Sequence, residues 1–112
     1  MKYEMIKLLD TIKADYTNWM TRCAKGAELS NHQKDMIVDF EINLDYTVGK
    51  KYIKVISNRS VWGFIVNTDT DKKFKKGDIL KAAGWNAPAR NAARGNVFEN
   101  YSVAWTGPHY LK

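Results

Sequence analysis

The chain has 112 residues, of which 45% are hydrophobic and 27% are charged, and its formal net charge is +6. This length is enough for one hydrophobic core but not for two, so we expect a single soluble domain over residues 1–112. We expect no membrane-spanning helix, because no stretch approaches the roughly 20 consecutive apolar residues that such a helix needs. Residues 1–4 begin an amphipathic pattern, which argues against a secretory signal.

An amphipathic helix is predicted over about residues 3–24. Its apolar residues recur at steps of three and four along one stripe: Met5, Leu8, Leu9, Ile12, Tyr16, Trp19, Met20 and Cys23. Lys25 in the last turn and Gly26 after it favour a helix end there. Cys23 is the single cysteine and cannot form an internal disulfide; its place on the stripe predicts a buried thiol in a reducing cytoplasm.

The next segment is ambiguous in its second half. Ser30 and Gln33 have the capping-box pattern, so a helix can begin at Asn31. Residues 36–48 fit either a helical face or a half-buried strand, because apolar and polar residues alternate along much of this stretch. We expect a helix over residues 31–45, since no turn signal interrupts the run.

From Gly49 onward the sequence breaks into short β-rich runs bounded by glycine, asparagine and aspartate. The predicted strands are residues 51–56, 60–66, 78–82, 96–98 and, as an optional fifth, 101–105. The first two are expected to form a hairpin that turns at residues 57–59, and a turn is expected at residues 107–108.

Helices followed by strands predict an α+β fold. We expect two N-terminal helices packed on one face of a small antiparallel sheet of 4–5 strands, with a short helix at about residues 87–94. The helical part covers about residues 3–45, and the β-rich part covers about residues 49–112.

The net positive charge of the chain lies in the β-rich part. Residues 1–48 hold 6 Lys/Arg against 8 Asp/Glu, a net charge of −2, whereas residues 49–112 hold 12 against 4, a net charge of +8. Such a distribution suits an anionic partner at the basic end, such as nucleic acid, a nucleotide or an acidic protein. The alternative is that the charge serves only solubility.

The first candidate site is a lysine-rich turn at residues 71–78. It places four lysines around one aromatic ring: Lys72, Lys73, Phe74, Lys75 and Lys76. Lysines can hold phosphates while an aromatic ring stacks on a base, as in proteins that bind single strands. Alternatively, the lysines are only solvated and Phe74 anchors the loop to the core.

The second candidate site lies in residues 84–96. An asparagine cap, an early proline, three alanines and a final glycine predict two turns of helix. Arg90 and Arg94, four residues apart, would then project from one face and grip a phosphate or carboxylate, with Trp85 as a stacking surface. The alternative is that both arginines pair with carboxylates of the acidic N-terminal half and that Trp85 packs in the core.

No catalytic signature is found. The patterns HExxH, CxxC, P-loop and GxSxG do not occur, and the two histidines, His32 and His109, lie near opposite ends of the chain. Asp69, Asp71 and Asp78 could bind a cation, but a lysine-rich loop is a poor metal site. We therefore expect a protein without enzymatic activity, and no cofactor or metal.

Several blocks in the basic half carry a resemblance. They are GKKYIKVI at residues 49–56, VWGFIV at 61–66, KFKKGDILKAAGW at 73–85, APARN at 87–91, GNVF at 95–98 and WTGPHYL at 105–111. Over about residues 49–111 the chain thereby resembles a family of small uncharacterised proteins of tailed bacteriophages. The resemblance implies no catalytic or binding residue, but it implies a setting, the cytoplasm of an infected bacterium. Small phage proteins often handle nucleic acid or disable a host or defence protein, which is an analogy.

The leading hypothesis is a non-enzymatic module that binds nucleic acid or another anionic partner. Its contacts are expected from both candidate sites: Lys72, Lys73, Lys75, Lys76, Arg90 and Arg94, with Trp85 or Phe74 stacking. One alternative is an inhibitor or modulator of a host or antiviral-defence protein that binds through an aromatic surface. Another is a binder of a nucleotide or small ligand, which would need a deep pocket around Trp85, Arg90 and Arg94. No membrane partner is expected, and the oligomeric state is left open.

Overall fold

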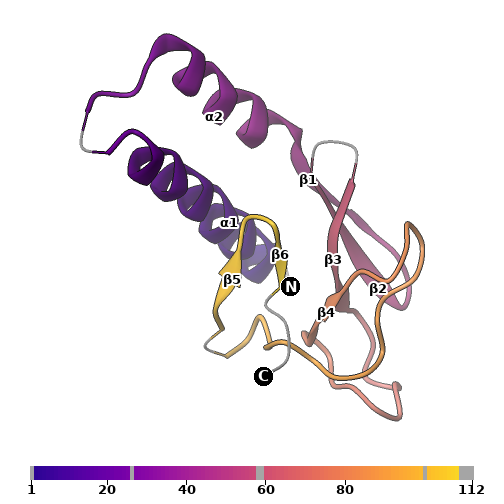
Figure 1. Cartoon of the computed structure of the whole chain (residues 1–112). Coiled ribbons are helices and arrows are strands. Elements are labelled where there is room, and N and C mark those ends of the chain that lie inside the picture. The colour runs from indigo at the N-terminus through magenta and orange to yellow at the C-terminus, as the bar shows by residue number, and fades with distance from the viewer. Residues whose placement is uncertain (1, 26, 58–59, 100, 109–112) are drawn as a thin grey trace.

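The computed structural model describes residues 2–25, 27–57, 60–99 and 101–108. The elements in chain order are α1 (Lys2–Cys23), α2 (Asn31–Asn43), β1 (Leu44–Val48), β2 (Tyr52–Ser57), β3 (Ser60–Val66), β4 (Ile79–Lys81), β5 (Val103–Ala104) and β6 (Gly107–Pro108). Strands β1 to β4 form an antiparallel sheet in that order, and β5 pairs with β6 in a separate ribbon. The two helices lie on one side of the sheet and the long loops on the other (Figure 1), so the predicted α+β fold is confirmed.

The main core forms between α1 and the helix-facing side of the sheet. The predicted stripe of α1 is buried at six positions: Met5, Leu8, Leu9, Ile12, Tyr16 and Met20. These side chains pack with Ile53 and Val55 of β2 and with Ile65 of β3. The predicted burial of Cys23 is wrong, because this thiol is exposed at the last residue of α1, beyond the last buried residue, Met20. No helix of the described residues is long and apolar enough to cross a membrane.

The expected helix over residues 31–45 is correct only as far as Asn43. Its start is confirmed, because Ser30 Oγ accepts from the N–H of Gln33 at 3.1 Å and Gln33 Oε1 accepts from the N–H of Ser30 at 2.9 Å. At Leu44 the backbone turns extended, and residues 44–48 pair with β2 as an edge strand. The alternating apolar pattern therefore describes a strand in its last five residues, where the partner β2 supplies the backbone hydrogen bonds that a helix would otherwise satisfy internally.

Replacing Ser30 by alanine is expected to lower the free energy of unfolding by about 1 kcal/mol, because the first turn of α2 loses its cap. Urea denaturation followed by circular dichroism measures this change. As a control, Thr21→Ala removes an exposed hydroxyl from within α1 and should not lower the urea midpoint. An unchanged midpoint for Ser30→Ala would contradict a stabilising role of the cap.

The β-rich half follows the prediction in its first three strands and departs from it later. Residues 52–57, 60–66 and 79–81 are strands β2, β3 and β4, and the predicted hairpin is present, although residues 58–59 of its turn lie outside the described residues. The predicted strand 96–98 is wrong: Asn96 makes a single bridge to Asp78, and the next two residues are a turn. The fourth strand of the sheet is β1 instead.

The C-terminal prediction is also corrected. Of residues 101–105 only Val103 and Ala104 are a strand, and they pair with residues 107–108, where a turn was expected, rather than with the main sheet. This ribbon is held to the core by side chains, since Trp62 Nε1 donates to the carbonyl oxygen of Ala104 at 2.9 Å and the N–H of Trp105 donates to Asp15 at 2.9 Å.

The predicted helix at residues 87–94 is wrong, and this segment runs beside β4 as an irregular extended chain. The N–H of Ala89 donates to Lys81 O at 2.7 Å, and the N–H of Arg94 donates to Ile79 O at 2.8 Å. Pro88 makes a bridge with Ala82. An unpaired edge strand offers a row of free backbone groups. The segment covers that edge of β4, and its N–H groups are used there instead of within a helix.

A second, smaller core lies on the side of the sheet away from the helices. It consists of Phe64 and Val66 of β3, Leu80 of β4 and Phe74 from the loop between them, with Tyr52 packed against it. Phe74 is only 6% exposed, so it anchors the lysine-rich turn to the sheet and offers no surface for stacking.

A buried polar pair fixes the chain where the lysine-rich turn enters β4. Asp78 Oδ1 accepts from Asn96 Nδ2 at 2.9 Å, and Asp78 Oδ2 accepts from the N–H of Lys75 at 3.0 Å. Gly77 precedes this pair with φ of +93°, and a Cβ there would lie 2.6 Å from the ring of Phe98. The turn therefore requires glycine at position 77. The Asp78 carboxylate stabilises the turn through its hydrogen bonds, so it is not a free ligand for a cation.

Candidate anion-binding site

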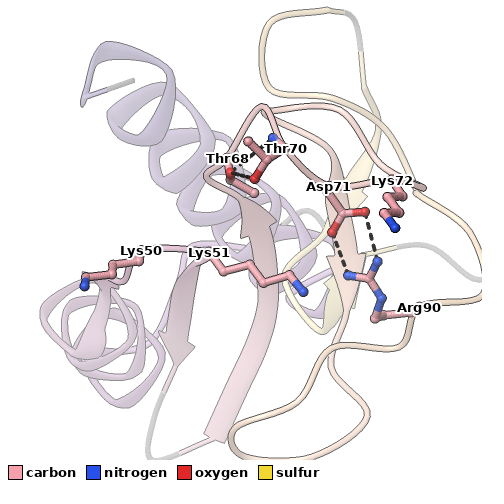
Figure 2. Close-up of a pocket in the computed structure, with 7 residues that line it drawn as sticks. All are labelled: Lys50, Lys51, Thr68, Thr70, Asp71, Lys72 and Arg90. Carbon is pink, nitrogen blue, oxygen red and sulfur yellow. Dashed lines mark hydrogen bonds and ion pairs between the residues drawn. The ribbon is translucent and has the colours of Figure 1, made fainter.

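A basic hollow of about 550 Å³ lies at the end of the sheet where the turn between β1 and β2 meets the loop after β3. We call this cavity the basic hollow. The residues that line it are Lys50, Lys51, Thr68, Thr70, Asp71, Lys72 and Arg90 (Figure 2). Asn67 ties its two loops together, since its N–H donates to Lys51 O at 2.8 Å and its Nδ2 donates to Gly49 O at 2.9 Å. Residues far apart in the sequence therefore share one cavity.

The base of the hollow is a bidentate ion pair between Asp71 and Arg90. Arg90 Nη1 and Nη2 each donate to a carboxylate oxygen of Asp71 at 2.9 Å. Asp71 also accepts from the N–H groups of Lys73 at 2.9 Å and Phe74 at 3.0 Å, and Arg90 donates to the hydroxyl of Tyr52. The Asp71 side chain is 1% exposed and that of Arg90 is 37% exposed. The buried carboxylate of Asp71 therefore accepts hydrogen bonds from four N–H groups, two of the Arg90 side chain and two of the backbone.

The pair holds both groups in their charged forms. The hydrogen bonds from Arg90, followed by those from the backbone of Lys73 and Phe74, keep the pKa of Asp71 well below its usual range. The hydrogen bond to Asp71 in turn raises the pKa of Arg90. The alternative in which Arg90 pairs with a carboxylate of the acidic N-terminal half is therefore wrong in its partner, because Asp71 lies in the basic half, 19 residues away in the chain.

The lysines supply the net charge of the hollow. Its lining carries four cationic side chains and one carboxylate, and Asp71 is already neutralised by Arg90. Lys51 extends toward the ion pair and Lys72 stands beside it, whereas Lys50 points away (Figure 2). An anion in the hollow would therefore meet Lys51 and Lys72 first.

Two threonines add neutral donors and acceptors. The hydroxyls of Thr68 and Thr70 are 2.8 Å apart, and the N–H of Thr70 donates to Thr68 Oγ1 at 3.2 Å. Whichever hydroxyl accepts in the first of these bonds retains its own hydrogen. One O–H group therefore remains to donate to a ligand.

The structure brings the lysine-rich turn and the segment of Arg90 side by side. Lys73 Nζ donates to the carbonyl oxygen of Arg90 at 2.5 Å and lies 5.5 Å from the centre of the Phe74 ring. Lys75 pairs with Glu99 at 3.2 Å, and Lys76 is exposed. Of the four lysines predicted as contacts, only Lys72 lines the hollow.

The predicted grip by Arg90 and Arg94 depended on a shared helical face, and that helix is absent at residues 87–94. Arg94 Nη1 donates to the carbonyl oxygen of Ala92 at 2.9 Å, and its Nε is buried without a hydrogen-bond partner. In an extended segment, residues four apart are separated by roughly 13 Å along the chain, whereas on a helix their Cβ atoms lie about 5–6 Å apart.

Trp85 is exposed at 52% and does not pack in the core. Its ring is 4.9 Å from Lys54 Nζ, which also donates to Asn86 Oδ1 at 2.7 Å. This contact places a flat aromatic surface and a cation next to each other on the side of the sheet that carries the loops.

Sequence reasoning missed the residues that line the hollow outside the two candidate segments. They are Lys50, Lys51, Thr68 and Thr70. The signal was present at Gly49, where a turn is followed by two adjacent lysines, but nothing in the sequence places that turn next to residues 68–72. The described residues hold no group of three or more His, Cys, Asp or Glu side chains that could bind a metal ion.

Comparison with known proteins identifies a protein family. Residues 1–109 match the model of a protein family described as a family of unknown function (DUF7717). No curated protein and no solved structure shows significant similarity to the chain.

Proposed function

We propose that this chain, which belongs to the family of unknown function DUF7717, is a non-enzymatic module that binds single-stranded nucleic acid. The observation that supports this most is the basic hollow, where Lys51 and Lys72 flank a neutralised ion pair. Phosphate contacts from lysine supply sequence-independent affinity. The resemblance to small phage proteins suggests the cytoplasm of an infected bacterium as the setting of this binding.

The exposed ring of Trp85 favours a single strand over a duplex. A base can stack on an aromatic side chain only when it is free of its own neighbours, as in single strands. Lys51 stands directly before β2, and Lys54, whose ammonium group contacts Trp85, is three residues further along the chain. In an extended chain Lys51 and Lys54 are therefore roughly 10 Å apart. A strand of a few nucleotides spans this separation, with phosphate at the hollow and a base at Trp85.

Binding is expected to weaken with salt, and two substitutions should separate its electrostatic part from its stacking part. For single strands the slope of log affinity against log salt is about −0.7 for each phosphate neutralised. Lys72→Gln should make this slope shallower by about 0.7, whereas Trp85→Ala should lower affinity by about 1–3 kcal/mol and leave the slope unchanged. Fluorescence anisotropy of a labelled oligothymidylate over a salt series measures both quantities.

A matched control is available on the other side of the molecule. Lys34→Gln removes the same charge from the exposed N-terminal turn of α2, outside the residues that line the hollow, and should leave the salt slope unchanged. Absence of binding to single-stranded DNA and RNA in low salt would refute the proposed function. An equal change of slope in the Lys34 and Lys72 variants would assign the effect to overall charge.

A protein partner is a second candidate, favoured by α2. This helix buries only Phe40, while Val38 is 52% exposed and Ile42 is 72% exposed. Large exposed apolar side chains on one helix are typical of protein contacts. Such a partner is a host or antiviral-defence protein in the phage setting. Capture of a specific protein from nuclease-treated bacterial lysate, lost in Val38→Ser/Ile42→Ser, would favour this candidate over nucleic acid.

A further inference from the structure

We propose that the basic hollow binds a terminal phosphate monoester, so that the protein prefers a strand end that carries a phosphate to the phosphodiesters within a strand. This inference rests on the proposed function and specifies which group of the nucleic acid the hollow holds. The same chemistry occurs in a mononucleotide or in inorganic phosphate, so the test includes both sources.

Charge is the first argument. A phosphate monoester carries about −1.5 to −2 near neutral pH, whereas a phosphodiester carries about one negative charge. Lys51 and Lys72 lie on the same concave surface, and the only carboxylate there, Asp71, is already paired with Arg90. Two ammonium groups that line one hollow favour a concentrated dianion over a single charge.

Donor geometry is the second argument. A monoester has three terminal oxygens, one more than the two unbridged oxygens of a diester, and each accepts hydrogen bonds. The hollow offers the ammonium groups of Lys51 and Lys72 and one free hydroxyl hydrogen of the Thr68/Thr70 pair. These donors come from the turn before β2 and the loop after β3, and they suit the three oxygens of a terminal phosphate.

Rigidity of the base is the third argument. The carboxylate of Asp71 receives four N–H bonds, and Asn67 links the two loops through two further bonds. Arg90 is therefore held by Asp71 and Tyr52, and the ligand is bound by the lysines and threonines above the pair. A volume of about 550 Å³ lies within the range of pockets for small ligands and accommodates a terminal nucleotide.

The experiment compares oligothymidylates that have the same number of phosphates. One carries a phosphate at its 5′ end, one carries it at its 3′ end, and the reference is one nucleotide longer with hydroxyl groups at both ends. We expect one phosphorylated ligand to bind about fivefold tighter than the reference, the ratio that one additional charge gives at about 4 Å from an ammonium group in water. Lys51→Gln and Lys72→Gln should each bring this ratio close to one, whereas Lys34→Gln should preserve it.

The outcomes distinguish this inference from the proposed function. Equal affinity for all three ligands overturns the terminal-phosphate site and leaves nucleic-acid binding intact. Failure of every oligonucleotide to bind refutes the proposed function. In that case thermal unfolding with inorganic phosphate and with thymidine monophosphate decides the inference. A rise in Tm that is absent in Lys72→Gln supports a phosphate site, and no rise overturns it.

Discussion

Replacing Asp71 by asparagine is expected to lower the Tm by several degrees at pH 7. The substitution keeps a side-chain oxygen for the backbone N–H groups of Lys73 and Phe74 but removes the charge that faces Arg90. Arg90 would then remain partly buried without its anionic partner, which is more costly than never having formed the pair. Thermal unfolding followed by circular dichroism measures the shift.

The effect of this substitution should depend on pH in one direction. The pKa of Asp71 is lowered in the folded protein, so its contribution to stability is complete above the pKa of the unfolded chain, about 4, and is lost progressively as the pH falls below it. The difference in Tm between the wild type and Asp71→Asn should therefore be constant from pH 7 to pH 5 and should narrow toward pH 3.

Asp69 provides the matched control for this prediction. It is an exposed aspartate in the same loop, and Asp69→Asn makes the same chemical change without touching the ion pair. Its Tm should equal that of the wild type across the whole pH range. A Tm of Asp71→Asn that equals the wild-type value at pH 7, or a difference that widens on acidification, would contradict the stabilising role of the pair.

Replacing Phe40 by alanine is expected to destabilise the protein by about 3–5 kcal/mol, the usual cost of emptying a buried aromatic site. Phe40 is 2% exposed, and its ring stacks on Tyr16 with centroids 4.1 Å apart and planes at 7°. It also meets Trp105 edge-on at 6.1 Å. Since Phe40 is the only buried residue of α2, its loss should weaken the attachment of that helix more than any other single change on it.

Urea denaturation at 25 °C measures this loss, and the fluorescence of Trp105 and Trp19, which lie in the same aromatic cluster, reports on its site. Ile42→Ala is the control on the same helix, because Ile42 is 72% exposed and its truncation should change the free energy of unfolding by less than about 0.5 kcal/mol. Equal destabilisation by the two variants would show that α2 is not held by Phe40.

Much of the fold could be predicted, because in several segments the local sequence pattern is compatible with only one type of secondary structure. The stripe of α1 buries one face, and the Ser30/Gln33 box fixes the start of α2. The hairpin of β2 and β3 is predicted by two β-rich runs that are separated by a short stretch of turn residues. The end of α2 could not be predicted in this way, because the apolar residues of 36–48 fit both the spacing of a helix and the alternation of a strand. Pairing with β2 is what makes the chain a strand from Leu44 onward.

The candidate site was predicted less well than the fold, because its geometry depends on which distant residues meet. The pattern of residues 87–94 favours a helix in isolation, and the open edge of β4 overrides it by accepting the N–H groups of Ala89 and Arg94. Without that helix, Arg90 and Arg94 do not share a helical face. Independently, Phe74 of the lysine-rich turn is buried in the second core.

The sequence by itself determined the α+β class, the separation of charge between the two halves and the chemical type of the basic surface. Those properties depend on composition and on contacts close in the chain, which can be followed residue by residue. Only the tertiary structure decided which cations are free to meet a ligand. Arg90 forms an ion pair with Asp71, while the packing of two loops places Lys51 and Lys72 in the lining of the same hollow. The pairing of charges across a fold is set by that packing, and no spacing along the chain reveals it.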